Sequence, residues 1–110
     1  KAFSIGEKST VTAQANHVKS AAIAVASKDR SAIVLENTTV NRIEHFVFAA
    51  YIKKPEFGAS SITSTGLRYT AGVPAKHLAQ TGCTISVDGT EVSQQDVDVD
   101  ELYRQQILGK

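Results

Sequence analysis

The chain has 110 residues, which suits one domain with a single hydrophobic core, and its 42% hydrophobic and 21% charged residues are ordinary for a globular protein. A formal net charge of +1 supplies no overall field that would attract nucleic acid or an anionic membrane, and the chain lacks the roughly 18 consecutive apolar residues of a membrane span. Cys83 is the single cysteine, so an internal disulfide is excluded and the thiol is expected to be a small buried hydrophobe.

Four segments of the chain share an eight-residue pattern. Each begins with a β-branched residue, carries Ala, Asn, Gly and Gly in turn at its fifth position, and ends with Val or Tyr. The first residues lie 22, 29 and 23 residues apart and are Val11, Ile33, Ile62 and Ile85. A period near 22 is typical of strand-based solenoids. Asn and Gly adopt a left-handed backbone at little cost, so tight corners are predicted at Asn37, Gly66 and Gly89, with Ala15 and Asn16 as a variant.

Further strands are expected before each segment and after each corner. The preceding strands are predicted at residues 3–5, 22–26, 46–50 and 77–80, and short following strands at 17–18, 39–40, 68–69 and 91–92. A β-sandwich of short strands is the alternative, but it does not require the fifth position to recur in register. We therefore predict an all-β fold, a right-handed parallel β-helix with three strands per coil and about four coils, over residues 1–92.

Residues 93–110 are predicted to form a C-terminal cap consisting of a short strand and a helix. Asp and Val alternate over 96–100, and in a strand the Asp side chains lie about 7 Å apart, too far to share a calcium ion. Their expected role is to discourage edge-to-edge pairing of sheets. We expect Asp100 to cap a helix over 101–108, whose Leu102, Tyr103 and Ile107 cover the open end of the coils.

No such cap precedes the first coil. The chain begins at Lys1 and contains no Met, so we expect a processed product or an excised piece whose coils continue upstream. An exposed coil edge would drive self-association into a homo-oligomer.

Three stretches carry a resemblance to known proteins. They are residues 49–58 (Ala-Ala-Tyr-Ile-Lys-Lys-Pro-Glu-Phe-Gly), 79–82 (Ala-Gln-Thr-Gly) and 96–103 (Asp-Val-Asp-Val-Asp-Glu-Leu-Tyr). Together they resemble the C-terminal part of bacterial right-handed β-helix repeat proteins, relatives in fold of the pectate lyases. The resemblance covers residues 6–103. It implies the fold, and a location at the cell surface, in the envelope or outside the cell, more strongly than it implies any chemistry.

The third coil is longer than its neighbours by residues 53–58, hereafter the inserted loop. In β-helix enzymes, grooves form beside the first strand set and its loops, so the resemblance directs attention to this corner. The candidate binding residues are Lys53, Lys54 and Glu56 in the loop, with Lys28 and Arg30 of the preceding coil. Such cations would stabilise the enolate formed by a polysaccharide lyase. The alternative is a charged, solvated corner that discourages aggregation.

Aromatic side chains are a second candidate feature. Alternation along residues 46–50 directs Val47 and Ala49 inward and Phe46 and Phe48 outward, where the rings would stack on sugars. Alternatively, the inserted loop covers both rings through Phe57, because adjacent exposed Phe side chains would form an unusual apolar patch.

Three functions remain open from the sequence. They are a non-catalytic scaffold that binds a surface carbohydrate or envelope component, one end of a polysaccharide lyase, and a self-assembling structural module. No catalytic constellation is recognisable, which favours the first. His17, His45 and His77 do not stand at metal-ligand spacing, so we expect no metal and no other cofactor, and a polysaccharide as partner instead of nucleic acid.

Overall fold

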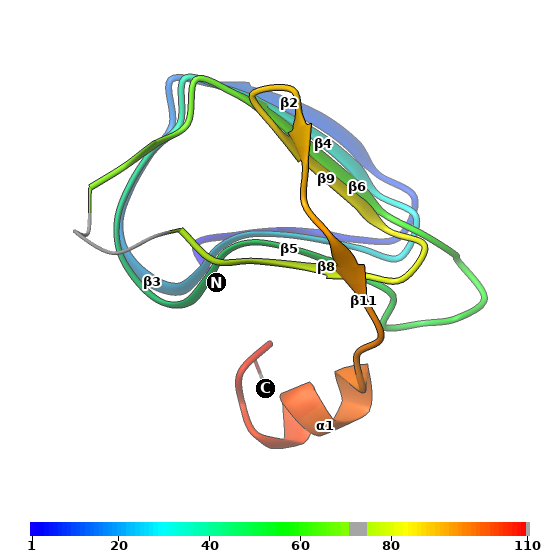
Figure 1. Cartoon of the computed structure of the whole chain (residues 1–110). Coiled ribbons are helices and arrows are strands. Elements are labelled where there is room, and N and C mark those ends of the chain that lie inside the picture. The colour runs from blue at the N-terminus through cyan, green and yellow to red at the C-terminus, as the bar shows by residue number, and fades with distance from the viewer. Residues whose placement is uncertain (71–74, 110) are drawn as a thin grey trace.

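The computed structural model describes residues 1–70 and 75–109, apart from the side chain of Phe3. These residues form two largely parallel β-sheets and one short helix (Figure 1). The elements are β1 (Phe3–Ile5), β2 (Thr10–Gln14), β3 (His17–Lys28), β4 (Ala32–Glu36), β5 (Thr39–Tyr51), β6 (Ser61–Thr65), β7 (Arg68–Tyr69), β8 (His77–Gln80), β9 (Thr84–Val87), β10 (Thr90–Glu91), β11 (Gln94–Gln95) and α1 (Val99–Arg104).

The chain alternates between the two sheets as it advances. One sheet has the order β1-β3-β5-β8-β11, with β7 also paired to β5, and the other has the order β10-β9-β6-β4-β2. Every pair is parallel except β9 with β10. Successive passes of the chain therefore lie one behind another (Figure 1).

The register of the second sheet coincides with the alignment of the four segments. Val11 pairs with Ile33, Ile33 with Ile62 and Ile62 with Ile85. Ile33, Ile62 and Ile85 are buried, whereas Val34, one residue on from Ile33, is 36% exposed. This alternation places one face of each strand between the two sheets.

The corners that follow these segments use the left-handed backbone expected of them. Ala15, Asn37 and Gly66 have φ values of 53°, 55° and 75°. At Gly66 a Cβ atom would lie 2.7 Å from the Asn37 Oδ1 atom, so a side chain there would force the Asn37 side chain to move. The fourth corner differs, because the chain reverses at Asp88 and Gly89 and β10 pairs antiparallel with β9. A short strand does follow this corner, at Thr90–Glu91, but it turns back along β9 instead of continuing into the other sheet.

The predicted strands after the first two corners do not stand alone. Residues 17–18 and 22–26 belong to the continuous strand β3, and residues 39–40 and 46–50 belong to β5. The register between β3 and β5 shifts between Ala21 and Ile23. A bulge of this kind bends a strand without breaking its pairing. The result is two sheets in place of three separate strand sets.

Apolar residues form two clusters. The interior cluster lies between the sheets and includes Val25, Leu35, Phe48, Ile62 and Ile85. The outer cluster lies on the far side of the β3-β5-β8 sheet, where the C-terminal segment covers it (Figure 1). Its buried members are Ile23, Ala26, Ala49, Tyr51, Leu78, Val99 and Leu108.

The C-terminal helix differs in position from the prediction. It spans Val99–Arg104, and Asp98, not Asp100, is its N-cap, with Oδ1 accepting the Glu101 N–H at 3.0 Å. The shift follows from packing, because an earlier start brings Val99, 7% exposed, into the outer cluster. Leu102 and Tyr103 pack on that same face of the sheet instead of on the end of the coils.

Candidate functional site

The candidate site is the corner where three passes of the chain stack. Glu7, Lys8, Asp29 and Arg30 all have left-handed φ values, of 60°, 65°, 57° and 65°, and Gly58 has a φ of 90°. The Lys8 N–H donates to the Asp29 carbonyl at 2.9 Å, and the Arg30 N–H donates to the Gly58 carbonyl at 3.0 Å. The segment carrying Lys28 and Arg30 therefore shares this corner with the inserted loop, as predicted, and Glu7 and Lys8 join it.

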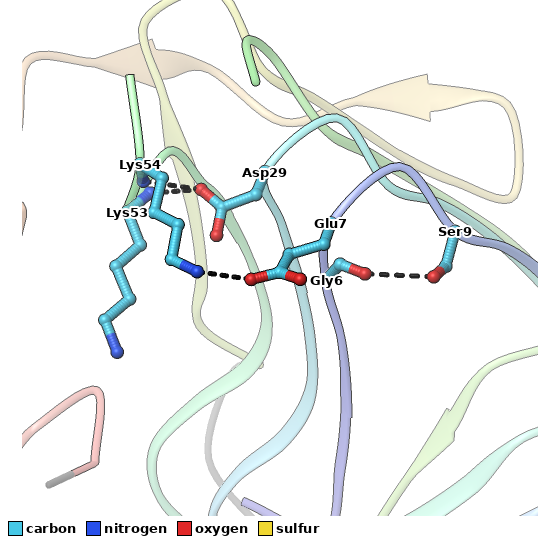
Figure 2. A network of polar contacts seen from close by, with 6 residues as sticks. All are labelled: Gly6, Glu7, Ser9, Asp29, Lys53 and Lys54. Carbon is cyan, nitrogen blue, oxygen red and sulfur yellow. Dashed lines mark hydrogen bonds and ion pairs between the residues drawn. The ribbon is translucent and has the colours of Figure 1, made fainter. Parts of the chain in front are cut away.

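Asp29 anchors the inserted loop. The residue is 1% exposed, and its Oδ1 atom accepts the backbone N–H groups of Lys53 at 2.8 Å and of Lys54 at 2.6 Å (Figure 2). A buried carboxylate needs such donors to offset the loss of hydration. Sequence reasoning did not single out Asp29, and its place between the candidate binding residues Lys28 and Arg30 was the available signal of this role.

Among the described residues, Lys54 is paired with a carboxylate and Lys53 is not. The Lys54 ammonium donates to the Glu7 carboxylate, which lowers the pKa of Glu7 and raises the pKa of Lys54. The Lys53 side chain extends away from this ion pair (Figure 2). Its Nζ atom lies 4.5 Å from the centroid of the Tyr103 ring. The two adjacent lysines therefore have different surroundings, and Lys53 has the unpaired charge of the two.

Lys53 belongs to a group of three ammonium groups, hereafter the lysine cluster: Lys1, Lys28 and Lys53. The Lys1 Nζ atom donates to the Tyr103 hydroxyl at 3.3 Å and lies 5.2 Å from the ring centroid. Partial burial, then the charges of Lys28 and Lys53, lower the pKa of Lys1 to about 8. Among residues 1–70 and 75–109, no carboxylate forms an ion pair with any member of the cluster.

A cavity of about 330 Å³ adjoins the lysine cluster. Its lining consists of Ser4, Gly6, Glu7, Lys28, Asp29, Lys53 and Lys54. The lining is mostly polar and includes two members of the cluster. The cavity is therefore a place where a charged group can meet both Lys28 and Lys53.

Two tyrosines support the cluster from the sheet and the helix. Tyr51 is fully buried, and its hydroxyl lies 2.8 Å from the Tyr103 hydroxyl. Burial raises the pKa of both phenols, with the hydrogen bond to Tyr103 contributing at Tyr51. Both hydroxyls therefore keep their protons, and one of them donates to the other. Sequence reasoning missed Lys1, Tyr51 and Tyr103, because only the folding of the C-terminal segment back onto the sheet brings them together.

The remaining predicted site residues do not line the cavity. Arg30 and Glu56 are exposed. Phe46 is half-buried against the outer cluster. The C-terminal segment covers this cluster, whereas the alternative prediction assigned the cover to Phe57. Phe48 is fully buried in the interior cluster, stacked on His77 with ring centroids 5.1 Å apart.

The predicted outward orientation of Phe48 and inward orientation of Ala49 are therefore wrong. Strict alternation fails in β5 because Val47 and Phe48, although consecutive, both belong to the interior cluster. Ala49 then belongs to the outer cluster. With no exposed surface, the Phe48 ring offers a sugar nothing to stack on.

The histidines and the cysteine take no part in this corner. Burial lowers the pKa of His77, and His17 is exposed. The Nε2 atom of His45 lies 3.5 Å from the Oε1 atom of Glu44. Within the described ranges, no three His, Cys, Asp or Glu residues gather as metal ligands would. Cys83 is fully buried, as predicted, and its Sγ atom accepts the Ser60 N–H at 3.4 Å.

In the part of the chain that the structure describes, no helix is long and apolar enough to cross a membrane. Comparison with protein families, with curated proteins and with solved structures finds no match for this chain. The structure agrees with the resemblance in being mostly β with two largely parallel sheets, but the comparisons identify no family or relative.

Proposed function

We propose that this chain is a module of a right-handed parallel β-helix that binds a surface carbohydrate, without catalysis, at the corner carrying the inserted loop. The observation that carries the proposal is the buried Asp29 carboxylate, which holds the backbone of Lys53 and Lys54 in place. A loop anchored in this way presents its side chains in one arrangement. Preorganisation of this kind lowers the entropy cost of binding.

The β-helix assignment is supported by the way the passes repeat. Equivalent residues of β2, β4, β6 and β9 stand in register, and left-handed corners follow the first three of these strands. β3 and β5 return the chain to the same side each time. A sheet pair built by this alternation is the cross-section that stacked coils require.

The acids at the corner favour binding over lyase chemistry. A lyase needs a base that removes a proton next to a carboxylate. Glu7 is engaged by Lys54, and Asp29 accepts two amide hydrogens. Lys1, with its pKa lowered to about 8, is the residue that would have to act as the base in the lyase alternative.

Electrophoresis through gels cast with neutral and acidic polysaccharides tests the proposal. We expect at least one polymer to retard the protein and Lys53→Ala to abolish most of the retardation. Lys19→Ala, which removes an exposed charge at the far end of β3, is the matched control and should migrate as the parent does. Retardation by none of the polymers would refute carbohydrate binding. Release of unsaturated sugars, detected by ultraviolet absorbance, would support the lyase instead.

A specific observation also favours the self-assembling module. The side of the molecule formed by β1 and β2 holds a cavity of about 390 Å³ bordered by Val18, Val25 and Leu35. The buried Oγ1 atom of Thr38 lies there with no hydrogen-bond partner among the described residues. The edge strand β2 carries no charge and no Pro, the usual protections against edge pairing.

This second candidate predicts a dimer in which β2 pairs with β2 of another copy. Ala15 N–H bonds to Glu36 and Ala32 N–H bonds to Ser9, so alternate residues face β4 and the Thr12 N–H points outward. We expect Thr12→Pro to abolish association, and Thr12→Val, which keeps the N–H, to preserve it. A species that is monomeric at every concentration in sedimentation velocity would rule the candidate out.

A further inference from the structure

The lysine cluster and its cavity carry more positive charge than their own carboxylates balance. Four lysines gather here against two acids, which leaves two positive charges: the cations are Lys1, Lys28, Lys53 and Lys54, and the anions are Glu7 and Asp29. Lys54 is already paired with Glu7, and Asp29 is directed at two backbone N–H groups. The three unpaired ammonium groups repel one another until an anion lies between them.

The scaffold holds these groups in place from three successive passes. Lys28 ends β3 and stands in register with Tyr51 of β5, two residues before Lys53. Lys1 precedes β1, which pairs with β3. The Ala2 N–H bonds to Ile23, so the Lys1 backbone lies at the other end of β1 from the corner, and only the Lys1 side chain reaches Tyr103, where the charges of Lys28 and Lys53 act on it.

Gly6 makes room for the Lys28 side chain. A Cβ atom at Gly6 would lie 3.0 Å from the Lys28 Cε atom and 3.1 Å from its Cγ atom. The φ of Gly6 is not positive, so backbone conformation does not demand a glycine at this position. A side chain at position 6 would press on the lysine stem, which would have to shift by a few tenths of an ångström.

Tyr103 positions the other two ammonium groups. Its hydroxyl accepts from Lys1, its ring lies against Lys53, and its own position is fixed by the hydrogen bond with the buried Tyr51 hydroxyl. The aromatic face favours a cation beside it without neutralising the charge. Each of the two ammonium groups therefore keeps N–H donors for a ligand.

We propose that Lys1, Lys28 and Lys53 form a binding site for a dianionic phosphate group, supplied by inorganic phosphate or by a phosphate monoester of a sugar. Near neutral pH such a group carries about −1.5 to −2 charges, which matches the excess of two positive charges at the corner. Its oxygens accept charge-assisted hydrogen bonds from several ammonium groups at once. This inference rests on the proposed binding function and names the chemical group that the corner recognises.

Titration with inorganic phosphate at constant ionic strength, followed by amide chemical shifts, tests the site. We expect saturable shifts at Gly6, Lys28 and Lys53, and a loss of affinity of about tenfold in Lys28→Ala and in Lys53→Ala, as expected for one lost charged hydrogen bond. Lys19→Ala, which removes an exposed positive charge at the far end of β3, is the matched control and should change affinity less than twofold. Each variant is compared with the parent by thermal unfolding.

Three outcomes would overturn the site: no saturable shift, an equal response to chloride, or equal affinities in the parent and in the Lys28 and Lys53 variants.

Glucose 6-phosphate and glucose are titrated alongside. Stronger binding of glucose 6-phosphate than of phosphate identifies a sugar phosphate as the ligand, whereas equal binding identifies the free anion. Phosphate binding without retardation by any polysaccharide refutes only the carbohydrate function, and retardation without phosphate binding refutes only this site.

Discussion

Replacing Asp29 with Ala is the sharpest test of how the corner is held. The change removes an acceptor of two charge-assisted hydrogen bonds, to the N–H groups of Lys53 and Lys54 at 2.8 and 2.6 Å, at a residue that is 1% exposed. A bond to a charged group contributes about 1.5–3 kcal/mol. Because the exposed loop can regain water at its amides, we expect a total loss of about 3 kcal/mol. At about 4 °C per kcal/mol, the unfolding midpoint falls by about 12 °C.

Asp88→Ala provides a matched control for this measurement. Asp88 has a left-handed φ of 49°, close to the 57° of Asp29, so both substitutions carry the same backbone cost. Its exposed carboxylate accepts one N–H, from Gly66 at 2.7 Å. We therefore expect a loss of about 1 kcal/mol at Asp88. Asp29→Asn, which retains an acceptor oxygen, should fall between the two.

Thermal unfolding followed by circular dichroism gives the stability differences. Amide hydrogen exchange gives the local consequence, with Lys53 and Lys54 losing protection in Asp29→Ala before the strands do. An unfolding midpoint within about 1 °C of the parent for Asp29→Ala would show that the carboxylate does not anchor the loop. The same result would remove the main support for the binding function.

Three further changes test separate parts of the structure. Tyr103→Phe leaves the buried Tyr51 hydroxyl without its partner, so we expect a loss of about 1–2 kcal/mol in chemical denaturation, and no loss would contradict the hydrogen bond. Gly66→Ala places a Cβ 2.7 Å from the Asn37 Oδ1 atom at a φ of 75°, and we expect about 1–3 kcal/mol of destabilisation, measured by thermal unfolding. Partial burial, then the charges of Lys28 and Lys53, lower the pKa of Lys1 from 10.5 to about 8. We therefore expect phosphate affinity to fall as the pH rises through 8, because Lys1 then loses its positive charge. Because the pKa is lower in the folded state, the cost of burying the charged amine lowers the stability below pH 8, and this cost is relieved as the pH rises towards 10.5. A phosphate affinity that stays flat from pH 7 to 9, beyond the range of the ligand's own titration, would exclude Lys1 from the site.

Local sequence determined the strands of the second sheet and the corners that follow them. The pattern around Val11, Ile33, Ile62 and Ile85 has a period of two within each segment, and that period places alternate residues between the sheets wherever the strand lies. Asn37 and Gly66 mark their corners because few residues accept a left-handed φ cheaply. Such preferences act within a few residues and can be recognised without knowledge of the fold.

Tertiary packing decided the features that local preference left open. Phe48 lies in the interior because β5 departs from strict alternation, a departure that packing between the sheets permits and no neighbouring residue announces. The helix begins at Val99 because the outer face of the sheet needs an apolar cover there, although Asp100 is an equally suitable cap by sequence.

The lysine cluster shows the same division most clearly. Lys28 and Lys53 could be placed at one corner from the repeat, because their distance along the chain corresponds to one pass. Lys1 and Tyr103 are 102 residues apart and meet only after the C-terminal segment folds onto the sheet. Sequence by itself therefore determined the period and the corners of the chain. The tertiary structure alone decided which charges remain unpaired, because that depends on contacts between residues with no regular spacing.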